Sequence, residues 1–169
     1  GYTALFEKML SHPGIEVVLN CLAESRVAFQ EDGTVTLDGV PFNGKVVYTG
    51  AVDELFGLKF GRLPYRTLDF QFETWEKEYF QPCATVNYTV SEDYTRITEF
   101  KYFLGQKLPQ TTTVKEYSRA YTGAAGEIPY YAVINPENNA LYEKYRALAG
   151  RYKGLYLLGR LAEYKYYNM

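Results

Sequence analysis

The stretch Leu68-Asp69-Phe70-Gln71-Phe72-Glu73 alternates apolar and polar side chains with a period of two. Because successive side chains of a β-strand point to opposite faces of its sheet, this alternation predicts a strand with one wet face. Further strand-like segments follow it at residues 84–88, 95–102 and 111–117. We therefore expect residues 61–135 to form an antiparallel sheet whose long strands cover something on one face.

Helical and short strand-like segments precede this sheet. Residues 1–11 repeat apolar side chains at helical spacing, which predicts an amphipathic helix. Residues 27–29 and 34–37 could pair as a hairpin across Glu31-Asp32-Gly33. The remaining elements expected here are strands at 15–19 and 45–48 and a short helix at 51–56.

A helix and a strand are also expected after the sheet. Asn138 or Asn139 can cap the helix, and Gly150 or Gly154 can end it. The apolar run at residues 155–158 then predicts a buried strand.

The predicted fold class is accordingly α+β. An α/β portion at residues 1–60 and its continuation at 136–169 flank the sheet of residues 61–135. This order predicts one truncated domain, in which the antiparallel sheet is inserted into the C-terminal part of a larger Rossmann-like α/β nucleotide-binding fold. The abrupt start at Gly1 and end at Met169 lead us to expect a piece cut from a longer protein.

Composition excludes several classes of function. The formal net charge of -2 gives no reason to expect nucleic acid or an anionic membrane as a partner. No apolar stretch approaches the ~20 residues that span a bilayer. Cys21 and Cys83 are expected to be reduced thiols of a cytoplasmic protein, and with His12 they form no metal-ligand cluster. The chain also contains no Gly-x-Gly-x-x-Gly, Walker or Gly-x-Ser-x-Gly motif.

The 18 tyrosines are the compositional anomaly. Tyrosine combines a large apolar ring with one hydrogen-bonding tip, so half-buried sheet faces account for most of them. A few could instead line a cleft for a sugar or a nucleotide. Tyr130 and Tyr131, which follow Pro129, form either a packed turn or a pair of phenols at a cleft rim.

Three arginines are candidates for an anion site, because each lies in or after a strand-like segment and near a tyrosine. These are Arg66, Arg96 and Arg160. A guanidinium offers a planar fork of donors that suits phosphate oxygens. The alternative is an exposed cation or a structural ion pair, for which Glu99 and Glu116 are the nearby acids.

Several short motifs occur together in a fixed order along the chain. They are Gly1-Tyr2, Tyr48-Thr49-Gly50 with Asp53 and Phe56, Gly61-Arg62-Leu63-Pro64-Tyr65-Arg66, Asn87-Tyr88, Tyr94-Thr95-Arg96-Ile97-Thr98-Glu99, Lys115-Glu116-Tyr117-Ser118, Pro129-Tyr130-Tyr131, and Gly159-Arg160-Leu161 with Tyr164 to Met169. In this order and spacing they resemble the UDP-galactopyranose mutase family over nearly the whole chain.

The resemblance implies an isomerase that interconverts UDP-galactopyranose and UDP-galactofuranose for cell-surface polysaccharide biosynthesis. It implies a Rossmann-like FAD-binding fold, FAD in its reduced form as the cofactor, a cytoplasmic location and a homodimeric parent. The cofactor supplies covalent catalysis at the anomeric carbon, while the protein orients the sugar and holds the departing UDP.

The resemblance also implies roles for individual residues. Arg96 resembles the diphosphate-binding arginine, and Tyr131 and Tyr166 resemble phenols that bind the same diphosphate. The polar residues near the sugar and flavin would be Asn87, Arg66 and Glu116, of which Arg66 and Glu116 join Arg96 as candidate catalytic residues. The candidate flavin contacts are Arg160, Asn168 and Met169.

The chain departs from the family pattern in several places. Asn168 stands where the family often has aspartate, and Ala132 stands where it has proline. The flavin-binding Gly-x-Gly-x-x-Gly segment, the helical region that stacks uracil and the terminal helix are absent. We therefore expect the chain alone to bind neither FAD nor UDP-sugar tightly. Two alternatives remain: a carbohydrate-binding module that stacks sugars on tyrosines, and a structural domain without catalysis.

Overall fold

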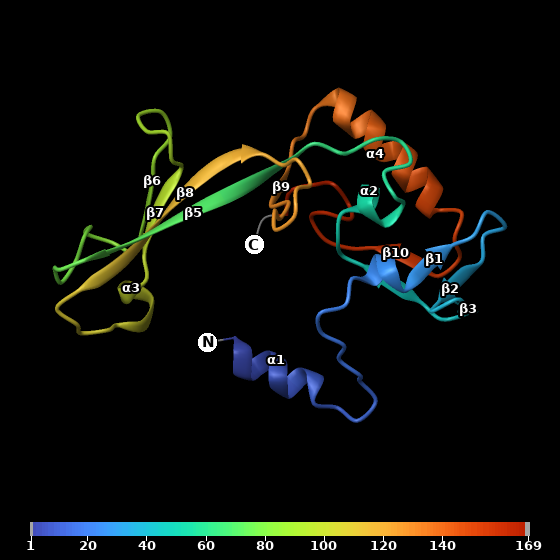
Figure 1. The fold of residues 1–169 in the computed structure, drawn as a ribbon, viewed down its shortest axis with the longest axis horizontal. Coiled ribbons are helices and arrows are strands. Elements are labelled where there is room, and N and C mark those ends of the chain that lie inside the picture. The colour runs from blue at the N-terminus through green and yellow to red at the C-terminus, as the bar shows by residue number, and fades with distance from the viewer. Residues whose placement is uncertain (1, 168–169) are drawn as a thin grey trace. The chain divides into compact units, whose positions relative to one another are not determined.

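The computed structural model describes residues 2–167. The chain divides into two compact units, one formed by Gly1–Gly44 with Tyr152–Gly154 and the other by Lys45–Arg151 with Leu155–Met169. Helices and antiparallel sheets occur together, which confirms the α+β class (Figure 1). The described helices are all too short or too polar to span a bilayer.

The first unit contains a helix and a small antiparallel sheet. Its elements are α1 (Thr3–Leu10), the 3₁₀ helix η1 (Ala23–Ser25), β1 (Val27–Phe29), β2 (Val35–Leu37) and β3 (Val40–Pro41). The β1–β2 hairpin is as predicted, and Val35 and a Phe29–Tyr152 ring contact pack beside it. The α1 helix was also predicted, but none of its residues is buried.

The strand predicted at Ile15–Leu19 is wrong. These residues have no regular structure, and Val17, Val18 and Leu19 are exposed. A strand needs a partner for its backbone groups, and among the described residues no strand pairs with this segment.

The second unit holds a parallel strand pair beside two helices. The strands are β4 (Val46–Tyr48) and β10 (Leu155–Leu157), and the helices are α2 (Val52–Leu55) and α4 (Pro136–Ala149). Asn135, not Asn138 or Asn139, caps α4: its side-chain oxygen accepts the Asn138 N–H at 2.8 Å, and Pro136 follows it. The C-cap is Gly150, one of the two glycines expected to end the helix. Because Tyr156 is 51% exposed, β10 is less buried than its apolar sequence predicted.

The second unit also contains a five-stranded antiparallel sheet (Figure 1). Its order is β6 (Thr85–Asn87), β7 (Arg96–Glu99), β8 (Thr111–Ala120), β5 (Tyr65–Trp75) and β9 (Tyr131–Ala132). The alternating stretch that opened the sequence analysis lies within β5, so the strand prediction there is confirmed.

The prediction of one strand over Thr95–Tyr102 is wrong at its end. The strand stops at Glu99, and α3 (Lys101–Leu104) follows. Glu99 is fully buried, and its carboxylate accepts the backbone N–H groups of Phe80 and Gln81. This carboxylate ties the strand end to the preceding loop, and the chain turns there.

Tyrosines form much of the hydrophobic core of the second unit. Tyr65, Tyr145 and Tyr164 are buried with Ala51, Val52 and Leu63. The hydroxyl groups of all three tyrosines donate to backbone carbonyls, which satisfies their polar tips inside the core. Their role is structural, but it differs from the expected half-buried sheet faces, because all three are fully buried and only Tyr65 lies in a strand.

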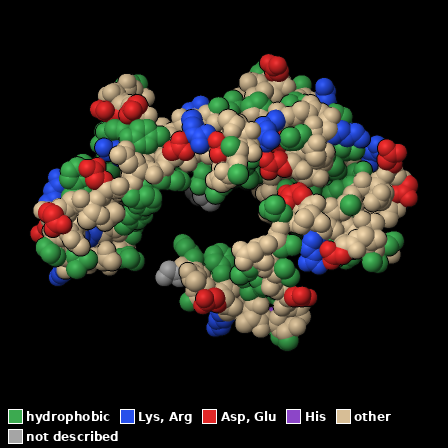
Figure 2. All heavy atoms as spheres, in the orientation of Figure 1, with side chains coloured by type: hydrophobic (Ala, Val, Ile, Leu, Met, Phe, Trp, Pro, Cys, Tyr) green, Lys and Arg blue, Asp and Glu red, His purple; other side chains and the backbone are tan. Residues whose placement is uncertain are grey.

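Apolar side chains are exposed at the far end of the five-stranded sheet, around α3. Figure 2 shows hydrophobic surface there, and the exposed residues include Phe72, Phe100, Phe103 and Leu104. Phe72 and Phe100 stack with ring centroids 6.2 Å apart.

Candidate functional site

The strand register puts five of the predicted site residues on one face of the sheet. Arg96 pairs with Asn87 on one side and with Glu116 on the other. Glu116 in turn pairs with Phe70 of β5. Arg66 lies four residues before Phe70 in the same strand and pairs with Tyr131 of β9.

Paired residues share a face, and so do residues an even number apart in one strand. Asn87, Arg96, Glu116, Arg66 and Tyr131 therefore lie on the same side, here called the Arg96 face. Residues far apart in the sequence share this face because β8 pairs with β7 and β5, and β5 also pairs with β9.

Arg96 is held by its two neighbours on this face. Its Nε donates to Oδ1 of Asn87 at 2.9 Å, and its Nη1 lies 3.7 Å from Oε1 of Glu116. The Arg96 side chain is 42% exposed, whereas the Glu116 side chain is 14% exposed. Of the two acids that the sequence offered as ion-pair partners, Arg96 contacts Glu116, and Glu99 is buried on the opposite face. An arginine held by two neighbours but still partly exposed can accept an anion.

Arg66 makes its contacts within the sheet. Its Nε donates to Oγ of Ser118 at 3.0 Å, and its Nη2 donates to the Ser118 carbonyl at 2.6 Å. Sequence reasoning gave Ser118 no role. Its position two residues after Glu116, which puts it on the same face, is the signal that could have identified it.

Arg160 meets the Arg96 face at Tyr131. The Arg160 Cζ lies 5.5 Å from the centroid of the Tyr131 ring, close enough for a cation–π contact. Tyr130, beside Tyr131, packs edge-on against Phe70. The register does not reach Tyr166, which is 68% exposed. The other candidate flavin contacts, Asn168 and Met169, lie outside the described residues.

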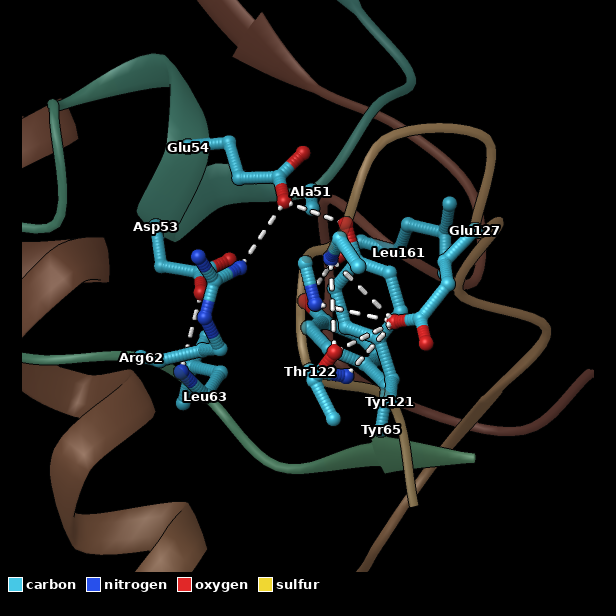
Figure 3. Close-up of polar contacts among 12 residues, drawn as sticks. Ala51, Asp53, Glu54, Arg62, Leu63, Tyr65, Tyr121, Thr122, Glu127 and Leu161 are labelled. Atoms are coloured by element: carbon cyan, nitrogen blue, oxygen red, sulfur yellow. Dashed lines mark hydrogen bonds and ion pairs between the residues drawn. The ribbon is translucent and has the colours of Figure 1, made fainter. Parts of the chain in front are cut away.

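A polar cluster lies at the start of β5, around Arg62, Leu63 and Tyr65 (Figure 3). The Glu54 carboxylate accepts hydrogen bonds from Arg62 at 3.1 Å and from the Tyr121 hydroxyl at 2.6 Å. Arg62 also lies over the Tyr121 ring. Burial, together with the hydrogen bond to Glu54, raises the pKa of Tyr121 to about 12. Its phenol therefore stays protonated and fixes the end of β8.

Asp53 is the most deeply buried acid of this cluster (Figure 3). Its Oδ2 accepts the Leu63 N–H at 2.9 Å, while its Oδ1 is buried without a hydrogen-bond partner. Burial raises the pKa of the Asp53 carboxyl because the charged form loses its water. The sequence analysis noted Asp53 within a motif without assigning it this role.

Glu127 closes the loop between β8 and β9 (Figure 3). Its Oε2 accepts the backbone N–H groups of Thr122, Gly123 and Ala124, and its Oε1 accepts from Arg119. The Arg119 hydrogen bond and the Thr122 N–H lower the pKa of Glu127 to about 2. A carboxylate thus holds the loop that leads to Tyr131.

A hollow of about 380 Å³ lies between this loop and the edge of β5. Its walls include Phe70, Tyr130, Arg119 and Glu127. The three charged residues of the lining already bond one another, because Arg119 pairs with both Asp69 and Glu127, so the hollow offers ring surface more than free charge. Within residues 2–167, no cluster of three His, Cys, Asp or Glu side chains is placed to hold a metal ion.

The parallel strands β4 and β10 end side by side, which positions Gly159 and Arg160. In α/β folds, ligands bind beyond the carboxyl ends of parallel strands. Gly159 has φ +91°, which suits glycine and turns the chain directly into Arg160. An arginine at such an edge fits an anionic or electron-rich group of a flavin. Since the chain has no Gly-x-Gly-x-x-Gly segment, these residues fit only part of a dinucleotide cofactor.

Comparison with known proteins gives a consistent result. The family model "UDP-galactopyranose mutase" matches residues 1–166. A UDP-galactopyranose mutase of Mycoplasma genitalium is 34% identical over the whole chain, and a probable UDP-galactopyranose mutase of Klebsiella pneumoniae is 36% identical. A dTDP-fucopyranose mutase of Escherichia coli is also 36% identical. The chain spans only 42%, 41% and 43% of these three relatives, respectively.

Proposed function

Because the chain belongs to the UDP-galactopyranose mutase family, we propose that it is the substrate-side portion of a flavin-dependent mutase. The whole enzyme would interconvert UDP-galactopyranose and UDP-galactofuranose. The observation that carries this proposal is the Arg96 face, where Asn87, Arg96 and Glu116 adjoin across three strands. The portion alone is proposed to be inactive.

Arg96 is proposed to bind the diphosphate of the nucleotide sugar. A fixed guanidinium offsets the negative charge that grows on UDP as it leaves. Asn87 and Glu116 would hold the Arg96 fork, since they already contact it at 2.9 and 3.7 Å. Tyr131 and Tyr166 would donate hydrogen bonds to the same diphosphate, and Arg66 and Glu116 would adjoin the sugar and flavin.

Reduced FAD is proposed as the cofactor, and when bound it would supply the nucleophile for the anomeric carbon. Arg160, Asn168 and Met169 are the proposed contacts from this chain. The parallel β4–β10 pair supports our proposal that residues 1–60 and 136–169 continue a Rossmann-like fold around the inserted sheet. We further propose a homodimeric parent in the cytoplasm. The free thiols of Cys21 and Cys83 agree with that compartment.

The test uses the whole protein that contains this chain, assayed for conversion of UDP-galactofuranose with and without dithionite. Arg96→Ala should lower turnover by about 100-fold or more and leave bound flavin unchanged, because it removes a transition-state contact. Lys115→Ala is the matched control, since Lys115 adjoins Glu116 in β8 but lies on the opposite face. Near-normal turnover of Arg96→Ala would contradict the assignment.

The substrate requires a second arm of the same assay. One relative of equal similarity is named for dTDP-fucopyranose, so both nucleotide sugars should be offered to the enzyme. Preference for the UDP sugar supports the proposal. Affinity for free sugars without flavin or nucleotide would instead favour a carbohydrate-binding module.

A further inference from the structure

The segment from Gly159 to Tyr167 carries two of the proposed ligand contacts, Arg160 and Tyr166, but it contains no strand or regular α-helix. Turns of this kind are usually mobile unless side chains fix them. What holds this segment in place therefore decides how well Arg160 and Tyr166 are positioned.

One carboxylate, that of Glu163, bonds both ends of the segment. Its Oε2 accepts the Gly159 N–H at 2.9 Å and also the Tyr167 hydroxyl. Its Oε1 accepts from Nζ of Lys165 at 2.8 Å. The Glu163 N–H donates back to the Gly159 carbonyl at 2.9 Å. Glu163 thus closes the turn around Arg160 from both directions.

The next residue fixes the segment to the core. Tyr164 has φ +47°, an uncommon value for a residue other than glycine, and only 2% of it is exposed. Its hydroxyl donates to the carbonyls of Pro64 at 2.6 Å and Val133 at 3.1 Å. Pro64 precedes β5 and Val133 follows β9, so Tyr164 ties the turn to the two strands that bear Arg66 and Tyr131.

This anchoring leaves Arg160 over the Tyr131 ring, 5.5 Å from its centroid. Tyr164 anchors the turn to the core, and Glu163 fixes the backbone before Arg160 through its hydrogen bonds to Gly159. The Arg160 carbonyl is fixed as well, because it accepts the Lys165 N–H at 3.1 Å.

We propose that Glu163 is a positioning residue that keeps Arg160 and Tyr131 together for the nucleotide sugar. The proposal rests on the proposed mutase function and adds a residue to its site. In this role Glu163 acts through the backbone of Gly159 and Arg160 and not by contact with the ligand.

The chemistry of Glu163 suits this role. Hydrogen bonds from Lys165, Tyr167 and the Gly159 N–H lower its pKa to about 2. It is therefore ionised at every pH at which an enzyme normally works, and its hydrogen bonds are charge-assisted. Glutamine at this position would retain an acceptor for Gly159 and Tyr167 and lose the charge.

The kinetic test compares three variants of the whole protein. Glu163→Ala should raise KM for UDP-galactofuranose about 10-fold or more, with a smaller fall in kcat, because the loss of charge-assisted bonds displaces Arg160. Glu163→Gln should recover most of the loss. Glu143→Ala is the control, since the Glu143 side chain is exposed and pairs with Arg146 three residues on. A fall in kcat alone, with KM unchanged, would indicate a lower folded fraction and overturn the proposal.

Limited trypsin digestion of the same proteins tests the turn without relying on activity. Cleavage after Arg160 and Lys165, followed by mass spectrometry, should be about 10-fold faster in Glu163→Ala than in Glu143→Ala. If Glu163→Ala does not fold, Tyr167→Phe removes one bond of the carboxylate and should accelerate the same cleavages.

The two readouts separate the two proposals. If even the unaltered protein converts neither nucleotide sugar, the mutase function fails and the role of Glu163 in that reaction fails with it. Accelerated cleavage would then still establish the turn. If the protein is active but Glu163→Ala changes neither KM nor cleavage, the positioning role of Glu163 is overturned and the mutase function stands.

Discussion

The two faces of the five-stranded sheet differ in the charged residues they carry and in how those residues are bonded. Within the strands, the Arg96 face carries two arginines and one glutamate; they are Arg66, Arg96 and Glu116. The opposite face carries three acids and two bases; they are Asp69, Glu73, Glu99, Lys115 and Arg119. A surplus of cations therefore lies on the face that holds the candidate site.

The bonding of these charges differs as well. On the opposite face, Arg119 bonds the carboxylates of both Asp69 and Glu127 at short distance. On the Arg96 face, Arg66 is held by the neutral Ser118, and Arg96 lies 3.7 Å from its acid. Charges that pair at short distance stabilise the fold, whereas a guanidinium held by a neutral partner, as Arg66 is, or farther from its acid, as Arg96 is, keeps its attraction for an anion.

The largest expected effect comes from replacing one arginine on each face with alanine. Arg66→Ala in the whole protein should lower kcat/KM about 10- to 100-fold and leave thermal stability nearly unchanged. Arg119→Ala should do the reverse, because it leaves Asp69 and Glu127 without their cation. Its midpoint of thermal unfolding should fall by a few degrees, with kcat/KM retained per folded molecule.

Kinetics on both variants, with the folded fraction measured by calorimetry, would check this pair. The Glu127 loop should survive Arg119→Ala, since three backbone N–H groups still bond the Glu127 carboxylate. Equal losses of activity in the two variants would break the distinction between the faces.

A second comparison concerns apolar residues. Ile97 points to the opposite face and is 2% exposed, whereas Phe72 points to the Arg96 face and is 64% exposed. Ile97→Ala should lower the free energy of unfolding by about 2–5 kcal/mol through the cavity it leaves. Phe72→Ala should change it by less than about 0.5 kcal/mol, because little burial is lost. Urea unfolding of the whole protein measures both; a large loss for Phe72→Ala would show that this face is packed.

The sheet could be predicted because its cause is local. The alternation around Phe70 requires a strand, and the two long strands then determine which residues share a face. The resemblance identified Arg96, Asn87 and Glu116 as site residues, and the register brings them together. In contrast, the strand predicted at Ile15–Leu19 depended on a partner strand, and none of the strands in residues 2–167 pairs with it.

The carboxylates that hold the loops could not be predicted for a different reason. Glu127 and Glu163 accept backbone N–H groups of turns, and no periodic pattern marks a turn that is closed by a side chain. Buried Asp53 is similar, because its raised pKa follows from how the chain folds over it. Such roles depend on tertiary contacts, and only coordinates reveal them.

The smallest expected effect is the contribution of the opposite face to the pH dependence of stability. The Arg119 hydrogen bond lowers the pKa of Asp69, and with the Thr122 N–H it lowers that of Glu127 from 4.5 to about 2. A lowered pKa in the folded state stabilises the protein above the ordinary pKa, and this stabilisation is lost as pH falls from about 4.5 toward 2. Asp53 acts in the opposite sense, since its raised pKa costs stability as pH rises above 3.8.

Glu127→Gln should therefore flatten the acid limb of the stability curve of the whole protein. The difference in unfolding free energy between Glu127→Gln and the unaltered protein should shrink as pH falls from about 5 to 2, because the native carboxylate then takes up its proton. Thermal unfolding across this range measures it. Glu73→Gln is the matched control, since Glu73 lies on the same face but forms a looser ion pair, 4.0 Å from Lys115. If Glu73→Gln flattened the curve equally, the tight bonding of Arg119 would not be what distinguishes this face.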